Sequence, residues 1–128
     1  MEAHSRWTMH WDEVSVFDSN AASLGVEEID LMRAAGESLA REASEMTTGM
    51  VLFLCGPGNN GGDGFVAACS EHLSGRSAVV ASRLSSNTEA SSRARSIAEE
   101  SPGVHVWPSI PDGDWELVVD CMLGAGGS

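Results

Sequence analysis

The chain contains no lysine, no glutamine and no tyrosine, so that all seven of its basic residues are arginines. The 19 Asp and Glu residues outnumber them and give a formal net charge of -12 at pH 7. Proteins that bind a nucleic-acid backbone carry a basic stripe that releases counterions, and an anionic membrane surface also attracts basic segments. The deficit of positive charge therefore argues against both a nucleic-acid partner and a membrane partner.

Long hydrophobic runs are missing as well. No apolar stretch approaches the roughly 18 residues that a membrane span requires, and the residues after Met1 are acidic and polar, unlike a signal peptide. The three cysteines are odd in number, lack a CxxC spacing and lie among apolar or small residues, which favours buried, reduced thiols: Cys55, Cys69 and Cys121. Together these features predict a cytoplasmic protein.

The excess of acid also predicts a response to salt. Self-repulsion at a net charge of -12 destabilises a compact fold in dilute buffer and is screened at high ionic strength. One hypothesis is a halophilic protein from a very salty cytoplasm, and the alternative is an ordinary acidic domain.

The 128 residues suffice for one domain with a real core. We expect the residues before Thr8 to form no regular structure. From Thr8 onward, apolar residues recur at steps of three and four, which is typical of helices. Later apolar runs of strand length alternate with helical patterns, which predicts a parallel sheet with helices on both faces, preceded by two N-terminal helices. The expected helices cover 8–24, 27–46, 65–73 and 86–97, and the expected strands cover 50–55, 78–81, 104–106 and 117–120.

The glycine-rich segment 56–64, Gly-Pro-Gly-Asn-Asn-Gly-Gly-Asp-Gly, follows a buried strand and precedes a helix. Ligands bind beyond the carboxyl ends of parallel strands, and glycines permit positive φ and close approach of backbone N–H groups to phosphate oxygens. We therefore interpret this segment as a phosphate-binding loop. The alternative is a tight crossover without a ligand.

The same segment contains GxGxxG, which by itself is a weak sign of a dehydrogenase. Asp63 lies where a pyrophosphate would disfavour negative charge. No acid follows the second strand to bind a ribose 2′-hydroxyl. Ser82-Arg83 follows it instead, and these residues are better suited to bind a 2′-phosphate. A dinucleotide dehydrogenase is therefore the second interpretation.

Oxygen-bearing side chains converge on the same sheet edge: Asn59, Asn60, Asp63 and Asp120. Hard oxygen ligands suit an alkali or alkaline-earth ion better than zinc. The alternative for Asp120 is that it caps a following turn. The four histidines are scattered without ligand spacing, and no nucleophile–base pairing emerges.

Three segments together resemble a known family. Residues 51–68 resemble the hallmark of the YjeF amino-terminal domain, the NAD(P)H-hydrate epimerases, and residues 31–36 and 118–126 resemble its flanking motifs in the right order. The resemblance implies a Rossmann-like fold, a potassium ion, and interconversion of the R and S epimers of hydrated NADH and NADPH (NADHX and NADPHX). It also implies that Asn60 and Asp120 bind potassium. The residues implied to contact the dinucleotide are Asn59, Asn60, Gly61, Gly62, Asp63, Gly124, Ala125, Gly126, Gly127 and Ser128.

Members of that family continue for several more strands, including an Asp-Xaa-Pro-Ser-Gly-like segment. We therefore expect residues 1–128 to be a partial YjeF amino-terminal domain, cut short at its C-terminus and originally fused to a dehydratase domain. No catalytic acid–base residue is assigned. The chain alone is expected to bind dinucleotide weakly and to epimerise it little. It is also expected to self-associate, for example as a homodimer. The alternatives are a non-catalytic nucleotide-binding or scaffold module and an NADP-binding dehydrogenase fragment.

Overall fold

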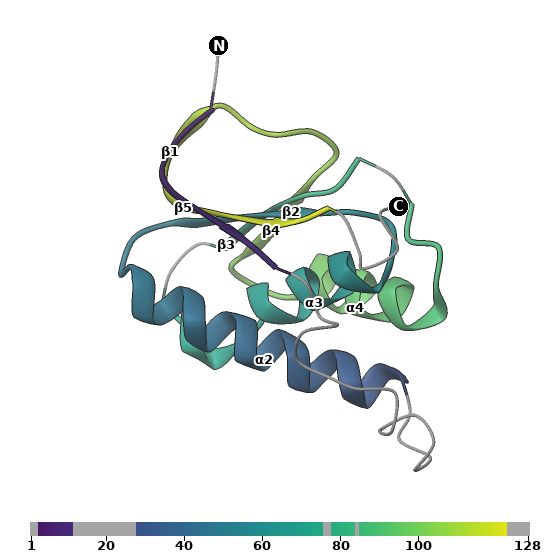
Figure 1. Ribbon diagram of the computed structural model, residues 1–128. Coiled ribbons are helices and arrows are strands. Elements are labelled where there is room, and N and C mark those ends of the chain that lie inside the picture. Colours follow the sequence, from purple (N-terminus) through teal and green to yellow (C-terminus); the bar gives the residue numbers. More distant parts are fainter. Residues whose placement is uncertain (1–2, 12–27, 76–77, 84, 123–128) are drawn as a thin grey trace.

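The computed structural model describes residues 3–11, 28–75, 78–83 and 85–122. Five parallel strands form one sheet in the order β1-β5-β2-β3-β4 (Figure 1). The strands are β1 (Ala3–His10), β2 (Val51–Cys55), β3 (Ala78–Ala81), β4 (Val104–Trp107) and β5 (Gly113–Cys121). The helices are α2 (Glu28–Met46), α3 (Asn59–Ala68), α4 (Glu89–Glu100) and the short 3₁₀ helix η2 (Glu71–Leu73). The α/β, Rossmann-like class is confirmed.

The direction of the chain across the sheet reverses beside β2. From β2 the chain steps outward to β3 and β4, and it then returns to place β5 on the other side of β2. The backbone N–H of Gly56 donates to the carbonyl of Cys121 at 3.1 Å, so the carboxyl ends of these two strands remain in contact. Such a reversal is where open α/β sheets bind ligands.

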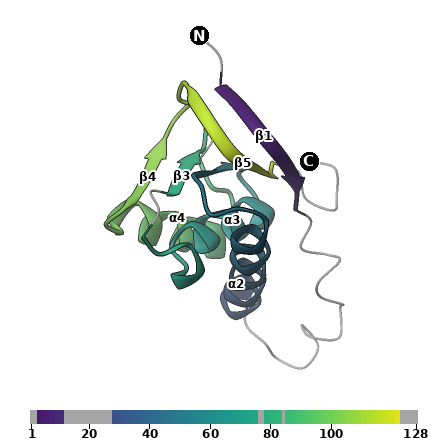
Figure 2. The ribbon, with the colours of Figure 1, turned by 90° about the vertical axis from the view of Figure 1, so that its left-hand side faces the viewer.

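All the described helices lie on one face of the sheet. Figure 2 shows α2, α3 and α4 together below the strands. Right-handed crossovers from β2 to β3 and from β3 to β4 run in the same direction, and they therefore place α3 and α4 on the same side. The link from β4 to β5, residues 108–112, crosses back without a helix. The expectation of helices on both faces is thus wrong for the described residues.

The N-terminal segment also differs from expectation. Thr8, expected to cap a helix after a loose start, lies inside β1, which pairs with β5 along the whole strand. The physical reason is a period of two: polar Arg6, Thr8 and His10 alternate with apolar neighbours, as a half-buried strand requires. Residues 12–24 of that expected helix lie outside the described residues. Because β1 pairs with β5, the strand predicted last in the sequence lies inside the sheet and not at its edge.

The main core lies between the sheet and the helix layer. Its largest fully buried side chains include Phe53, Phe65 and Met32. A Cβ added to Gly36 would lie 2.4 Å from Cγ1 of Val66, so α2 and α3 pack closely at this glycine. A smaller apolar cluster occupies the opposite sheet face: Leu52, Val79, Ala81 and Trp115.

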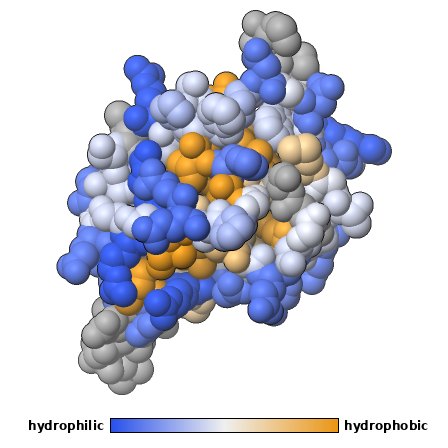
Figure 3. Space-filling model, turned by 180° about the vertical axis from the view of Figure 1, so that it is seen from behind, coloured by the Kyte–Doolittle hydropathy of each residue, from blue (hydrophilic) through white to orange (hydrophobic). Residues whose placement is uncertain are grey.

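The outer edge of β4 has no strand paired with it among the described residues. Figure 3 views the molecule from behind, the side of β4 and α4, and shows apolar surface in the middle of a hydrophilic border. Ile97, Trp107 and Ile110 are each about half exposed, at 48%, 49% and 54%. Within the described part of the chain, no helix is long and apolar enough to cross a membrane.

Candidate functional site

The glycine-rich segment is mostly helix. α3 begins at Asn59, six residues before the expected start at Phe65, and only residues 56–58 form a loop. Glycine is a poor helix former, so the local sequence favours a loop. Packing of the segment against its neighbours overrides that preference.

Two glycines show what this packing requires. A Cβ on Gly61 would lie 2.0 Å from the carbonyl oxygen of Gly56, and one on Gly62 would lie 2.5 Å from Sδ of Met32 and 3.2 Å from Cα of Ser91. Any side chain at Gly61 would therefore collide with backbone. These glycines let the first turn of α3 sit directly on the loop before it and between α2 and α4.

Backbone conformation gives the same answer. The described glycines with positive φ are Gly75, Gly103 and Gly113, and all three lie outside residues 56–64. The expectation that the segment uses positive φ is therefore wrong. Its glycines serve close packing instead.

Gly58 is the exception, because a Cβ there would meet nothing within 4 Å. It caps α3 with an extended backbone (φ -90°, ψ -166°) and without a side-chain hydrogen bond. The first N–H groups of a helix have no partner inside it and form the positive end of its dipole. The start of α3 therefore offers an open anion-binding position at the reversal of the sheet.

Asn59 connects three helices through its side chain. Its Nδ2 donates to Oε1 of Glu28 at the start of α2, and its Oδ1 accepts from Oγ1 of Thr88 at 2.6 Å. Thr88 also caps α4, where its Oγ1 accepts from the N–H of Ser91 at 3.0 Å, so the cap lies two residues after residue 86, the expected start of this helix. The Asn59 amide thus fixes the helix starts relative to one another.

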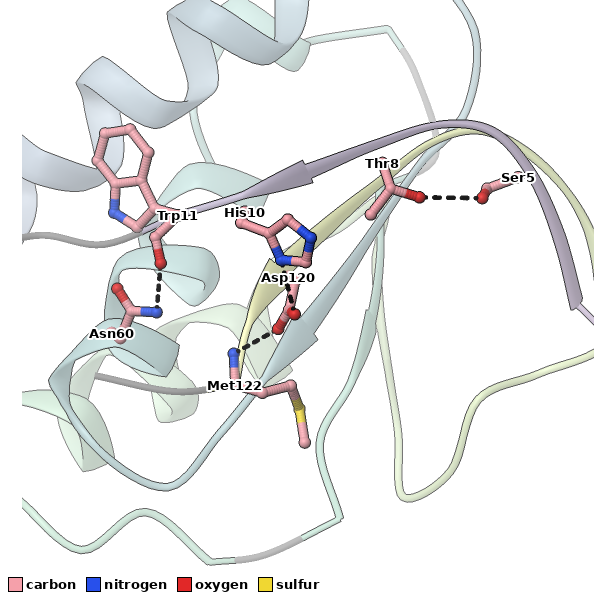
Figure 4. Close-up of polar contacts among 7 residues, drawn as sticks. All are labelled: Ser5, Thr8, His10, Trp11, Asn60, Asp120 and Met122. Carbon is pink, nitrogen blue, oxygen red and sulfur yellow. Dashed lines mark hydrogen bonds and ion pairs between the residues drawn. The ribbon is translucent and has the colours of Figure 1, made fainter. Parts of the chain in front are cut away.

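Asn60 and Asp63 both bind Trp11, the residue that follows β1. Nδ2 of Asn60 donates to the Trp11 carbonyl at 2.7 Å, and the indole N–H of Trp11 donates to Oδ2 of Asp63 at 3.0 Å (Figure 4 draws the first contact). The three residues are nearly buried, with 3%, 0% and 8% exposed for Asn60, Asp63 and Trp11. Sequence reasoning missed Trp11 as a site residue, although its place in the alternating pattern of β1 is a signal for it.

Asp120 lies at the end of β5 and has two partners. Its Oδ2 lies 3.0 Å from Nδ1 of His10, its register partner on β1, and its Oδ1 accepts the N–H of Met122 at 3.0 Å (Figure 4). The second contact is the turn-capping role considered as the alternative for Asp120. His10, read from the sequence as one of four scattered histidines, is thereby brought to the edge where the expected site residues lie.

Among the described residues, no group of three or more His, Cys, Asp and Glu side chains could hold a metal ion. Asn60, in the first turn of α3, and Asp120, near the end of β5, both lie at the carboxyl ends of the strands (Figure 4). They bring an amide oxygen and a carboxylate, which are hard donors suited to an alkali cation. The expected substrate residues 124–128 lie outside the described residues.

The cysteines offer no reactive nucleophile. Cys55 and Cys121 are register partners on β2 and β5 and are buried, which raises the pKa of each thiol well above its ordinary value. Partial burial also raises the pKa of Cys69, whose Sγ lies 3.6 Å from Oγ of Ser101. All three are free cysteines, as expected, and Cys69 is only partly buried.

Comparisons with known proteins show the family of this chain. The family model described as "YjeF-related protein N-terminus" matches residues 28–128. Similar curated proteins include two archaeal "Bifunctional NAD(P)H-hydrate repair enzyme Nnr" proteins. The one from Methanospirillum hungatei is 34% identical over 128 residues, covering 91% of this chain and 26% of the relative. The one from Archaeoglobus fulgidus is 34% identical over 116 residues, covering 89% and 24%.

A bacterial protein of the same description, from Thermanaerovibrio acidaminovorans, is 37% identical over 126 residues, covering 90% of this chain and 24% of the relative. The chain therefore spans about a quarter of the length of the curated relatives it matches.

Proposed function

This chain belongs to the family of YjeF-related protein N-termini, and from that premise we propose that it binds NADHX and NADPHX and takes part in interconverting their R and S epimers. The relatives are bifunctional NAD(P)H-hydrate repair enzymes. Assigning the epimerase step to this part of such an enzyme is our proposal, as is the assignment of a dehydratase step to a region outside residues 1–128.

The start of α3 is the observation that supports this proposal most strongly. Its N-terminus is uncapped by any side chain, has open space at Gly58 and lies at the reversal of the strand order. A pyrophosphate placed there would meet backbone N–H groups and the positive end of the helix dipole. In a chain with a net charge of -12, such local donors matter because the overall field repels an anion.

The expected substrate residues would then act in two ways. Asn59 and Gly61 would offer backbone N–H groups, because the Asn59 side chain already binds Glu28 and Thr88. Asn60 would position the turn through its contact with Trp11. Gly62 would permit the close packing that holds this turn, and Asp63 would fix it through Trp11. Residues 124–128 remain the proposed second substrate loop.

Potassium is part of the proposal, with Asn60 and Asp120 as donors. A bound cation would offset the charge of Asp120 and of the dinucleotide phosphates at this edge. The contact between Asp120 and His10 leaves His10 79% exposed, so the imidazole can turn away without unpacking the core. The proposal assigns no catalytic acid or base.

An epimerisation assay tests the proposed function. It follows the chromatographically purified S epimer of NADPHX and measures formation of the R epimer, with and without potassium. General acid–base catalysis needs donors within about 3 Å of the reacting atom, and residues 1–128 are not expected to supply all of them. Residues 1–128 are therefore assayed in amounts stoichiometric with NADPHX, and the whole polypeptide encoded at the locus is assayed beside them. We expect acceleration over the spontaneous rate, largest for the whole polypeptide. Bound NADPHX that epimerises at the spontaneous rate with both would favour a nucleotide-binding module instead.

A further inference from the structure

A pocket of about 350 Å³ opens at the carboxyl ends of β2 and β3, on the sheet face that carries the smaller apolar cluster. This volume lies in the lower part of the range for small-molecule sites. Its lining is largely apolar and contains no acid, in a chain with 19 Asp and Glu residues. The lining residues are Leu54, Ala81, Ser82, Arg83, Pro108, Ser109, Ile110 and Met122.

Ser82 and Arg83 form the polar end of this pocket, and Arg95 binds the first of them. Ser82 is 2% exposed, and its Oγ accepts from Nη1 of Arg95 at 3.0 Å. Arg83, the next residue, is exposed, lines the pocket and forms no ion pair within the described part of the chain. A guanidinium group presents a planar set of donors that matches a phosphate group. The pocket therefore combines apolar walls with a local positive charge.

The position of the pocket fits one half of a dinucleotide, and this step rests on the proposed function. If the pyrophosphate lies at the start of α3, one nucleoside extends toward the ends of β3 and β4 and the other toward Asp120 at the end of β5. The apolar walls suit a flat adenine ring. An arginine that follows the second strand of such a unit is placed to reach a phosphate on the adenosine ribose.

We propose that this pocket takes the adenosine end of the substrate and that Arg83 binds its 2′-phosphate. The site then prefers the hydrate of NADPH to the hydrate of NADH. Arg83 acts as a specificity-determining residue, and Arg95 holds the neighbouring Ser82 in place.

Calorimetric titration of the 128-residue chain at fixed ionic strength tests this inference. The two probes are adenosine 2′,5′-bisphosphate and adenosine 3′,5′-bisphosphate, which carry the same charge and differ in the position of one phosphate. We expect the 2′,5′ isomer to bind about tenfold more tightly, as one charge-assisted hydrogen-bonded contact implies. Arg83→Ala should abolish the preference. Arg41→Ala, an equal loss of charge on an exposed position of α2, should retain it.

Equal affinity for the two isomers, a preference that survives Arg83→Ala, or no binding of either probe would overturn the inference. The probes contain no nicotinamide, so the outcomes are separable. Epimerisation without the 2′-phosphate preference refutes this inference alone. The preference without epimerisation refutes the proposed function alone.

Discussion

At the scale of single residues, the glycines of the segment 56–64 divide into two kinds. Gly61 and Gly62 lie where a side chain would collide with packed neighbours, whereas Gly58 faces open space at the helix start. The first kind is required by the fold, and the second leaves room for a ligand. Substitutions at the two kinds should therefore have different consequences.

We expect Gly61→Ala to destabilise the protein by about 2 kcal/mol, because the added Cβ meets the Gly56 carbonyl and overpacking outweighs the gain in helix propensity. Gly58→Ala is the matched control and should change the free energy of unfolding by less than about 1 kcal/mol while weakening dinucleotide binding. Urea denaturation and titration with NADPHX measure the two effects. Equal stability of the two variants would show that the packing at Gly61 has been misjudged.

The cysteines give a pH dependence that this composition makes easy to detect. The chain has no lysine or tyrosine, so its cysteines are the side chains that titrate near pH 9 and above, below the range of arginine. Burial raises the pKa of Cys55 and Cys121 in the folded state, so only the unfolded chain ionises them just above the ordinary value of 9.0. Stability should therefore be constant with respect to these thiols below pH 9 and fall as the pH rises above it.

Urea denaturation at a series of pH values checks this expectation. In the native protein, a thiol reagent should modify Cys69 slowly and leave Cys55 and Cys121 untouched until the chain unfolds. Fast modification of all three thiols in the native state would contradict the burial of the pair.

At the scale of elements, β1 joins the sheet edge to the start of α3. Its pairing with β5 brings His10 to Asp120, and Trp11 then binds Asn60 and Asp63 on α3. The residue after β1 thus holds the proposed anion-binding turn from the side of the sheet. Glu28 and Thr88 hold it from the side of the other helices, through the Asn59 side chain.

We expect Trp11→Phe to destabilise the protein by about 2 kcal/mol, because it keeps most of the ring but removes the N–H that binds the buried Asp63 carboxylate. Trp7→Phe, at a residue that is 49% exposed, is the control and should change stability by less than about 0.5 kcal/mol. Thermal or urea denaturation provides the measurement. Identical stabilities of the two variants would argue against the contact between Trp11 and Asp63.

The sequence allowed most elements to be predicted, and the failures have identifiable physical causes. β3 matched its predicted range because four consecutive apolar residues between turn residues permit little else. The start of α3 could not be predicted, since its glycines pack closely against Met32, Ser91 and Gly56, and the local sequence does not show these contacts. The role of β1 required reading a period of two, and the contact between His10 and Asp120 depends on strand order, which local patterns do not specify.

At the scale of the whole molecule, charge is the dominant property. Seven arginines face 19 acids, and the ion pairs among the described residues are few and largely exposed, so they offset little of the self-repulsion. The halophilic hypothesis follows from this balance and remains a prediction.

We expect the melting temperature to rise by about 5 °C or more between roughly 0.05 M and roughly 2 M salt, because screening weakens repulsion among like charges. Parallel series in sodium chloride and potassium chloride separate charge screening from potassium binding. Screening raises the melting temperature equally in both salts, whereas a potassium site raises it further in potassium chloride alone. A melting temperature that does not change in either series would contradict the hypothesis.

The central claim is that a dinucleotide binds at the start of α3, and amide chemical shifts during titration with NADPHX test it most directly. The account predicts the largest changes at Asn59, Asn60 and Gly61, and little change at Gly75 and Gly103, which precede β3 and β4 at the opposite sheet edge. Changes concentrated at Gly75 and Gly103, or none at the start of α3 when NADPHX is bound, would contradict it.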